Sequence, residues 1–240
     1  MNIALIFAGG TGQRMNTRST PKQFLEVHGK PVLIYTLELF EQHPQIDGIV
    51  LVCLESWIPY CRTLLDKFHI TKVKSIVPGG NSGQESIYHG VLKAHELYPA
   101  DSVLLIHDGV RPLIDQKTIT DCIACAKKNG NAITVSPAIE TIFLKAEEKD
   151  QVGNIFNRAD CMMAKAPQCF RLDDIYEAHQ KALAENECDF IDSAILMQHY
   201  GATLFMVEGP TSNIKITMPS DFYIFRAILD ARENLQIMGL

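Results

Sequence analysis

Glycines and basic residues cluster near the start of the chain in a pattern that can bind phosphate. An apolar run at 3–7 leads directly into Ala-Gly-Gly-Thr-Gly at 8–12. Such closely spaced glycines let the backbone turn tightly and approach a ligand without a Cβ in the way. The N–H groups of this kind of loop can form an anion-binding nest, beside which Arg14 and Lys22 add positive charge. A loop of this composition after a first strand suggests that polyphosphate binds at the carboxyl edge of a sheet.

The glycines by themselves fit a plain tight turn equally well. The loop is not a P-loop, because no Gly-Lys-Ser/Thr follows at the required spacing. Residues 10–15 also do not complete the Gly-x-Gly-x-x-Gly fingerprint of dinucleotide-binding proteins. Arg14 and the run Pro21-Lys22-Gln23 favour phosphate binding over the plain turn.

A second group of polar residues follows another apolar run. Asp108 comes after the strand-like residues 102–107, and Arg111 follows shortly. In an open α/β sheet, ligands bind outside the carboxyl ends of the strands, where an Asp can accept from a sugar hydroxyl or help to place Mg²⁺ near phosphates. Asp108 could instead cap the following turn or pair with Arg111. His107 should point to the opposite face of the sheet, and we interpret it as structural.

Two more cations stand out further along the chain. Lys215 is the single cation in the apolar segment 214–217, which we expect to be a strand. A buried Lys needs an anion or a depressed pKa, so Lys215 is either a ligand-binding cation or one half of a structural ion pair. Arg158 lies at the end of a predicted hairpin arm, which could carry it into the site of a neighbouring subunit.

Arg14, Lys22 and Lys215 together suit nucleotidyl transfer. In this reaction a phosphate oxygen attacks the α-phosphate of a nucleoside triphosphate, and pyrophosphate leaves. The reacting groups are all anions, so the protein mainly positions them and stabilises the developing charge. The sequence shows no Ser-His-Asp or Cys-His nucleophile set and no cluster with zinc-ligand spacing.

The elements that must position these residues alternate between strands and helices, which predicts a parallel sheet with crossover helices. The expected strands are 3–7, 48–54, 73–77, 102–107, 132–136, 203–207 and 214–217. The expected helices are 32–42, 84–97, 118–128, 173–184, 191–200, one from a Ser56 cap to about 68, and one from 219 to about 233. We expect residues 1–240 to form one domain.

Residues 139–160 break this alternation. Short strands at 141–145 and 154–157 flank a charged turn, and few apolar residues are available to bury against the main sheet. We predict a protruding β-arm that grips a second subunit. An ordinary surface hairpin is the alternative.

Composition excludes several classes of protein. The 240 residues carry a formal charge of −6 with no block of Lys or Arg, which argues against a nucleic-acid partner or a polybasic membrane surface. No apolar run approaches the ~18 residues of a membrane span, and no secretory signal opens the chain. The seven cysteines are scattered, which indicates reduced thiols and a cytoplasmic location.

Six motifs occur in an order that resembles a known family. They are Ala8-Gly9-Gly10-Thr11-Gly12-Gln13-Arg14-Met15, Pro21-Lys22-Gln23-Phe24-Leu25, Gly79-Gly80, His107-Asp108-x-x-Arg111-Pro112, Ala166-Pro167-Gln168-x-Phe170 and Asn213-Ile214-Lys215-Ile216-Thr217. Together they resemble the 2-C-methyl-D-erythritol 4-phosphate and ribitol-5-phosphate cytidylyltransferases. Each motif alone is modest, but six in order over nearly the whole chain are specific.

The resemblance implies a Rossmann-like nucleotidyltransferase fold, with a mostly parallel sheet flanked by helices and a projecting β-hairpin arm that joins a homodimer. It implies CTP as the nucleotide donor and Mg²⁺ bound mainly through the CTP phosphates, with no dedicated set of protein metal ligands.

The resemblance also implies roles for individual residues. Arg14 and Lys22 would stabilise the pentavalent α-phosphate, and Asp108 would contact hydroxyls of the acceptor or the ribose. Lys215 and the partner's Arg158 would position the acceptor phosphate, and Thr141 matches an arm position that faces the acceptor. The residues expected around CTP are Phe7, Ala8, Gly9, Gly10, Gly12, Gly80, Asn81, Ser82, Gly83, Ser86, Asp108 and Gly109.

The acceptor region favours the ribitol-phosphate branch. Methylerythritol enzymes usually carry Thr-Pro-Gln and Thr-Asp-Glu where this chain has Ala166-Pro167-Gln168 and Ile191-Asp192-Ser193. Each missing hydroxyl should cost a polyol on the order of 1 kcal/mol. Val110 and Trp57 also look like the ribitol-phosphate branch, whereas Gly83 and Ala166 depart from both.

The resemblance therefore implies that CTP and D-ribitol 5-phosphate give CDP-ribitol and pyrophosphate, for teichoic-acid-like or capsular polymers. One alternative is the methylerythritol phosphate enzyme of isoprenoid synthesis. Another is a non-catalytic nucleotide-binding protein that kept the fold. A different polyol or sugar phosphate acceptor also stays open.

Overall fold

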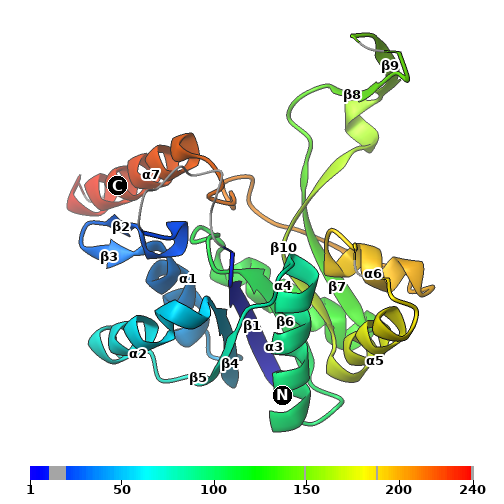
Figure 1. Cartoon of the computed structure of the whole chain (residues 1–240). Helices are drawn as coiled ribbons and strands as arrows, with labels where there is room; N and C mark the ends of the chain where they lie inside the picture. Colours follow the sequence, from blue (N-terminus) through cyan, green and yellow to red (C-terminus); the bar gives the residue numbers. More distant parts are fainter. Residues whose placement is uncertain (11–19, 149, 188, 239–240) are drawn as a thin grey trace.

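The computed structural model of the chain describes residues 1–10, 20–148, 150–187 and 189–238, with side chains up to residue 235. Its centre is a seven-stranded sheet in the order β11-β7-β10-β6-β1-β4-β5 (Figure 1). The strands are β1 Asn2–Ala8, β4 Gly48–Cys53, β5 Val73–Pro78, β6 Val103–Asp108, β7 Asn131–Pro137, β10 Met162–Arg171 and β11 Met206–Glu208. Only β10 runs antiparallel to its neighbours among these described strands, which confirms the predicted mostly parallel sheet.

Helices cover both faces of the sheet. They are α1 Val32–Glu41, α2 Ile58–Lys67, α3 Gly83–Leu97, α4 Gln116–Asn129, α5 Leu172–Ala184, α6 Ser193–His199 and α7 Pro219–Met238. One core packs α1, α2 and α4 against the sheet, and a second packs α3, α5 and α6 against the other face. Ile3 and Leu5 face the second core, while Ala4 and Ile6 face the first. Because β1 is buried on both sides, it is a continuous apolar run instead of an alternating one.

The order of the strands places a crevice beside β1. The chain passes outward from β1 to β4 and β5, and then returns through α3 to β6 on the other side of β1. Connections therefore leave β1 and β6 in opposite directions, and a crevice forms outside the carboxyl ends of two such strands. α3 lies very close to the sheet at Gly90, where a Cβ would be 2.2 Å from Leu5 Cδ1 and 2.8 Å from Val52 Cγ2. This close packing holds the first turn of α3 near the crevice.

The predicted strand at 214–217 is wrong, because this segment has no regular secondary structure. A sheet-like hydrogen bond runs from Ile216 N–H to the carbonyl of Val110, at 2.9 Å, in the loop after β6. Ile216 is fully buried with Phe225 of α7. The apolar residues of this segment are therefore explained by burial under α7 and not by pairing in the sheet.

β10 was not predicted from the sequence, although it is the longest strand and lies inside the sheet between β6 and β7. Pro167 lies within it and cannot donate to a ladder, which argues against a central strand when only the sequence is known. The structure accommodates the proline through a shift in the β10–β7 register between Ala164 and Gln168.

Two smaller expectations also differ from the structure. A 3₁₀ turn, η3 Glu55–Trp57, precedes α2, so Ser56 lies inside that turn and does not cap the helix. The late strand expected at 203–207 is observed as β11, which begins at Met206 and pairs with β7.

The predicted arm is present. β8 Ile142–Lys145 and β9 Val152–Phe156 form an antiparallel pair that extends well away from the sheet (Figure 1). Phe143 and Ile155 are cross-strand partners, and both side chains are more than half exposed.

Across the described part of the chain, none of the helices combines the length and apolar character of a membrane span.

Candidate active site

A cavity of about 760 Å³ opens where the sheet order predicts a crevice. It is bordered by the ends of β1 and β6, the loop between β5 and α3, the segment before α7, and η2 Lys22–Phe24, a 3₁₀ turn. The lining residues are Phe7, Ala8, Gly9, Gly10, Lys22, Gln23, Gly80, Asn81, Ser82, Gly83, Ser86, Asp108, Val110, Lys215 and Thr217. Most of the predicted nucleotide-binding residues therefore lie together. Gly12 and Arg14 lie outside the described residues.

Gly109 takes a different place from the other predicted nucleotide-binding residues. It is buried and does not line the cavity. A Cβ on Gly109 would be 2.9 Å from Ala8 Cβ and 3.0 Å from Leu33 Cδ1. Its lack of a side chain thus lets the turn after β6 pass close to the end of β1.

The two glycine-rich loops touch each other across the floor of the cavity. A Cβ on Gly9 would lie 3.2 Å from Gly79 Cα and 3.3 Å from Ser86 Oγ, which is tighter than an ordinary contact. Ser86 Oγ accepts from Gly80 N–H at 2.9 Å and donates to the Ser82 carbonyl at 2.8 Å. Ser86 thereby fixes the second loop, and the paired glycines let it approach the first.

The second loop leads into the positive end of α3. Ser82 caps this helix by accepting from Glu85 N–H at 3.0 Å, and Glu85 in turn accepts from Asn81 N–H at 2.6 Å. Free N–H groups and the helix dipole make a helix N-terminus favourable for anions. Ser82 and Gly83 line the cavity, so this end of α3 borders it.

Asp108 is held by two cations. Its Oδ1 lies 2.6 Å from Lys215 Nζ, and its Oδ2 accepts from Arg111 Nε at 2.7 Å. Asp108 is nearly buried, whereas the Lys215 side chain is 43% exposed. The expectation of a buried Lys215 is therefore wrong, because the irregular segment leaves its ammonium at the cavity. Both pairings considered as alternatives, Asp108 with Arg111 and Lys215 with an anion, are present in the structure.

The electrostatics of this cluster favour an anionic ligand. Burial alone would raise the pKa of Asp108, but Lys215 and Arg111 outweigh it and lower that pKa to about 2. Asp108 is therefore ionised near neutral pH, and the three side chains carry net positive charge. Burial lowers the pKa of His107 to about 4, and its ring lies 5.1 Å from that of Phe40 in the core. His107 is thus a neutral core residue, as predicted.

Asn213 braces this cluster, although the sequence indicated it only as part of a motif. It is fully buried, its carbonyl accepts from Arg111 Nη1 at 3.0 Å, and its Nδ2 donates to the Ala166 carbonyl at 2.7 Å. Asn213 thereby connects the segment before α7 to the central strand β10. The missed strand was the reason that this role could not be found from the sequence.

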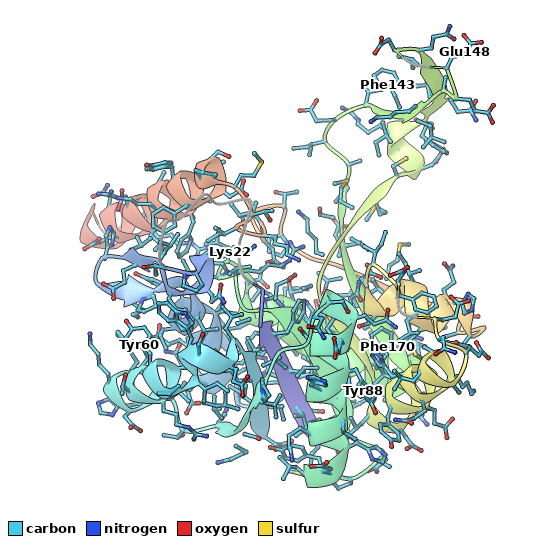
Figure 2. The ribbon with its side chains drawn as sticks, viewed as in Figure 1. Lys22, Tyr60, Tyr88, Phe143, Glu148 and Phe170 are labelled. Carbon is cyan, nitrogen blue, oxygen red and sulfur yellow. The ribbon has the colours of Figure 1, made fainter. Side chains whose placement is uncertain are left out.

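Thr141 and Arg158 do not reach this cavity. They line a separate hollow at the base of the arm, where Arg158 Nη1 donates to the Ile139 carbonyl at 3.2 Å. Figure 2 shows Lys22 near the end of β1, and Phe143 and Glu148 at the far end of the arm. Within one chain, the predicted arm residues therefore lie apart from the predicted nucleotide site.

The depressed pKa of Asp108 predicts a contribution to acid stability. A carboxyl whose folded pKa is about 2, against an ordinary value of about 4, stabilises the fold above about pH 4 and loses that effect as the pH falls toward 2. We expect this loss to be about 2 kcal/mol in the wild type. Asp108→Asn should lack this component, so its unfolding free energy should fall less between pH 4 and pH 2 in urea titrations. Asp121→Asn, which removes an exposed pair with Lys117, is the control. Parallel curves for wild type and Asp108→Asn would contradict the assignment.

Sequence comparisons agree with the geometry of the site. The family model of 2-C-methyl-D-erythritol 4-phosphate cytidylyltransferase matches residues 2–231. A ribitol-5-phosphate cytidylyltransferase of Vibrio parahaemolyticus is 51% identical over 239 residues, which covers 100% of both chains. A 2-C-methyl-D-erythritol 4-phosphate cytidylyltransferase of Clostridium botulinum is 40% identical and covers 95% of this chain and 97% of the relative.

A structural comparison extends this agreement to the fold. The crystal structure of 4-diphosphocytidyl-2C-methyl-D-erythritol synthase from Anaerococcus prevotii is similar with a TM-score of 0.80 and 28% identity. The similarity covers 95% of each chain. The family expected from the six motifs is thus confirmed over nearly the whole length. The chain belongs to the 2-C-methyl-D-erythritol 4-phosphate cytidylyltransferase family, whose fold and motifs it shares from β1 into α7.

Proposed function

We propose that this protein transfers a cytidylyl group from CTP to D-ribitol 5-phosphate and releases CDP-ribitol and pyrophosphate. The observation that carries the proposal is the full-length similarity to a ribitol-5-phosphate enzyme at about 50% identity. The ribitol-5-phosphate enzyme from Vibrio is 51% identical over the full length, against 40% for the methylerythritol enzyme from Clostridium. The methylerythritol enzyme of isoprenoid synthesis is the alternative, because the family description and the similar crystal structure carry that name.

The acceptor region supports the ribitol branch. Ile191 stands where methylerythritol enzymes usually carry a threonine. The Ile191 side chain is 89% exposed, and the next residue, Asp192, caps α6. An exposed hydrocarbon at this position offers a polyol no hydrogen bond, so a methylerythritol acceptor would lose partners that its own enzymes provide.

The cavity has the charges that this transfer needs. A phosphate oxygen of the acceptor forms a bond to the α-phosphorus of CTP, and the bond from that phosphorus to the bridging oxygen breaks. The electron pair leaves with pyrophosphate, so no side chain has to act as a nucleophile. Lys22, together with Arg14, would stabilise the charge on the α-phosphate, and Lys215 would hold the acceptor phosphate.

Mg²⁺ fits this site as a partner of the nucleotide. No group of three or more acidic, His or Cys side chains suited to a metal occurs among the described residues. Asp108 is the acidic residue among those lining the cavity, and both of its oxygens already bond to cations. The ion would therefore be held mainly by phosphate oxygens and would neutralise their charge. The described cysteines are free thiols, which agrees with the cytoplasmic location that we propose.

The arm supports a homodimer with shared sites. Its exposed side chains include Ile139, Phe143 and Ile155, and apolar groups on a thin hairpin have too little of the hairpin to pack against. We propose that the arm packs against a second copy of the chain. It would there deliver Arg158 and Thr141 to the acceptor side of the partner's cavity.

The experiment that tests this function is an acceptor panel. Pyrophosphate release with CTP should be fastest with D-ribitol 5-phosphate and much slower with 2-C-methyl-D-erythritol 4-phosphate and other polyol phosphates. Turnover of the methylerythritol substrate alone would refute the ribitol assignment. CTP binding without release for the whole panel would point to a non-catalytic nucleotide-binding protein.

Lys22→Ala should lower kcat by about two to three orders of magnitude, because it removes one stabiliser of the transition-state charge. Arg14→Ala should have an effect of the same size. Lys117→Ala is the matched control, because this exposed lysine on α4 pairs only with Asp121 among the described residues. Near-normal kcat in both Lys22→Ala and Arg14→Ala would refute the roles assigned to them.

Arg158→Ala should raise the KM for the polyol phosphate by about 10- to 100-fold, as expected for the loss of a charge-assisted hydrogen bond. The KM for CTP should change much less. Equal effects on both substrates would remove Arg158 from the acceptor site.

A mixing experiment tests whether Arg158 acts across the interface. At a polyol phosphate concentration below the wild-type KM, Lys22→Ala and Arg158→Ala should each have little activity. When mixed, their subunits would form heterodimers with one intact site and one doubly substituted site. Random exchange should then restore roughly a quarter of the wild-type activity. No recovery after demonstrated subunit exchange would mean that Arg158 acts within its own chain.

A further inference from the structure

Gln23 is a buried polar residue that connects two parts of the site. Its side chain is 1% exposed, and its Nε2 donates to the Ala8 carbonyl at 2.6 Å and to the Gly10 carbonyl at 3.2 Å. Both donors of one amide nitrogen are thus used on the first glycine loop. A buried amide is costly without such bonds, and removing it would leave two carbonyls without this donor.

These bonds control the backbone of the glycine loop. Gly9 and Gly10 have no side chains to restrict their conformation, so the loop needs an external group to hold it. In a planar trans peptide the C=O and the N–H point in opposite directions. Fixing the Ala8 carbonyl toward Gln23 therefore fixes the N–H of Gly9 away from it. Gln23 in this way sets the direction of an N–H group in a loop that lines the cavity.

The same residue also fixes the position of Lys22. The turn η2 is closed by Phe24 N–H donating to the Pro21 carbonyl at 2.9 Å. Phe24 is buried, and its ring stacks on that of Trp57 with a centroid distance of 4.7 Å. Lys22 is therefore followed in its turn by two anchored residues. Gln23 ties the turn to the glycine loop, and Phe24 ties it to the core.

We propose that Gln23 is a positioning residue for the transfer reaction. It holds the first glycine loop and Lys22 in the fixed relation that a bound triphosphate requires, without contacting the reacting atoms. Only the turnover assay of this proposal rests on the proposed function. The geometry of Gln23 concerns nucleotide binding, which can be measured without an acceptor. A displacement of about 1 Å in such a site can cost about 100-fold in rate.

The first test compares Gln23→Leu and Gln23→Glu with the control Gln116→Leu. Gln116 also donates its amide to a carbonyl, that of Leu39 at 2.9 Å, but it lies on α4 away from the cavity. Both Gln23 variants should lower kcat/KM for CTP by about 10- to 100-fold at pH 8. The control should retain wild-type values.

Gln23→Glu adds a pH signature that a general loss of stability would not produce. An ionised Glu cannot donate to the Ala8 carbonyl, whereas a protonated Glu has one O–H that can. Burial and neighbouring carbonyl oxygens raise the pKa of such a carboxyl. Its kcat/KM relative to wild type should therefore rise as the pH is lowered from about 8 to about 6. Gln23→Leu should show no such recovery.

Trp57 supplies a readout that does not depend on turnover. It is the single tryptophan of the chain, and it stacks on the residue next to Gln23. Titration with CTP in the absence of an acceptor, followed by tryptophan fluorescence, should give a Kd raised in both Gln23 variants and unchanged in Gln116→Leu. This rise in Kd would support the positioning role even if no acceptor were turned over. A lack of turnover would contradict only the proposed function.

Three results would overturn the proposal. The first is an unchanged Kd and kcat/KM in a folded Gln23→Leu protein. The second is a Gln23→Glu protein that binds CTP as wild type does at every pH. The third is a Gln23→Glu protein with a lowered melting temperature and no recovery of activity at low pH, which would show that Gln23 serves folding only. If Gln23→Leu does not fold, Gln23→Glu decides alone.

Discussion

The buried carboxylate of Asp108 is the interaction on which the cation cluster beside the cavity depends. It accepts from Lys215 and Arg111, and so it joins the end of β6 to a segment that has no strand pairing of its own. A nearly buried charge is costly unless it is paired, so this segment cannot separate from β6 without leaving the carboxylate unpaired. Arg111 is itself held by the carbonyl of Asn213. The position of the Lys215 ammonium thus follows from a small network of buried polar bonds.

The nucleotide half of the site depends on a different constraint, the close approach of two loops. A Cβ on Gly9 or Gly79 would contact the other glycine more tightly than is usual, and each loop is held by a side chain from outside it, Gln23 for the first and Ser86 for the second. Backbone N–H groups, one helix N-terminus and fixed cations then surround one cavity. Such a site does not need a nucleophilic side chain, because preorganised positive charge is what transfer between phosphates requires.

In the dimer that we propose, the arm would link the choice of acceptor to assembly. In one chain, Arg158 and Thr141 line a hollow of their own, and none of its lining residues belongs to the nucleotide cavity. In the dimer that we propose, each arm completes the site of its partner. Of the residues that depart from the methylerythritol pattern, Gly83 lines the nucleotide cavity, whereas Ala166 and Ile191 line neither this cavity nor the hollow at the base of the arm.

The sequence alone determined the α/β class, the projecting arm and most residues of the nucleotide cavity. The α/β class, the arm and the first glycine loop depend on local signals, namely buried apolar runs, glycines at strand ends and a change of pattern at 139–160. The other residues of the cavity were expected from the resemblance to the family. Only the tertiary structure decided the rest. Because Pro167 lies within it, the central strand β10 could not be predicted. The apolar residues of 214–217 are buried by α7 and not by pairing in a strand. The exposure of Lys215 follows from the irregular backbone of this segment. The bonds of Gln23 also could not be predicted from the sequence. Its partners Ala8 and Gly10 lie 15 and 13 residues away in the chain and meet it only in the folded protein.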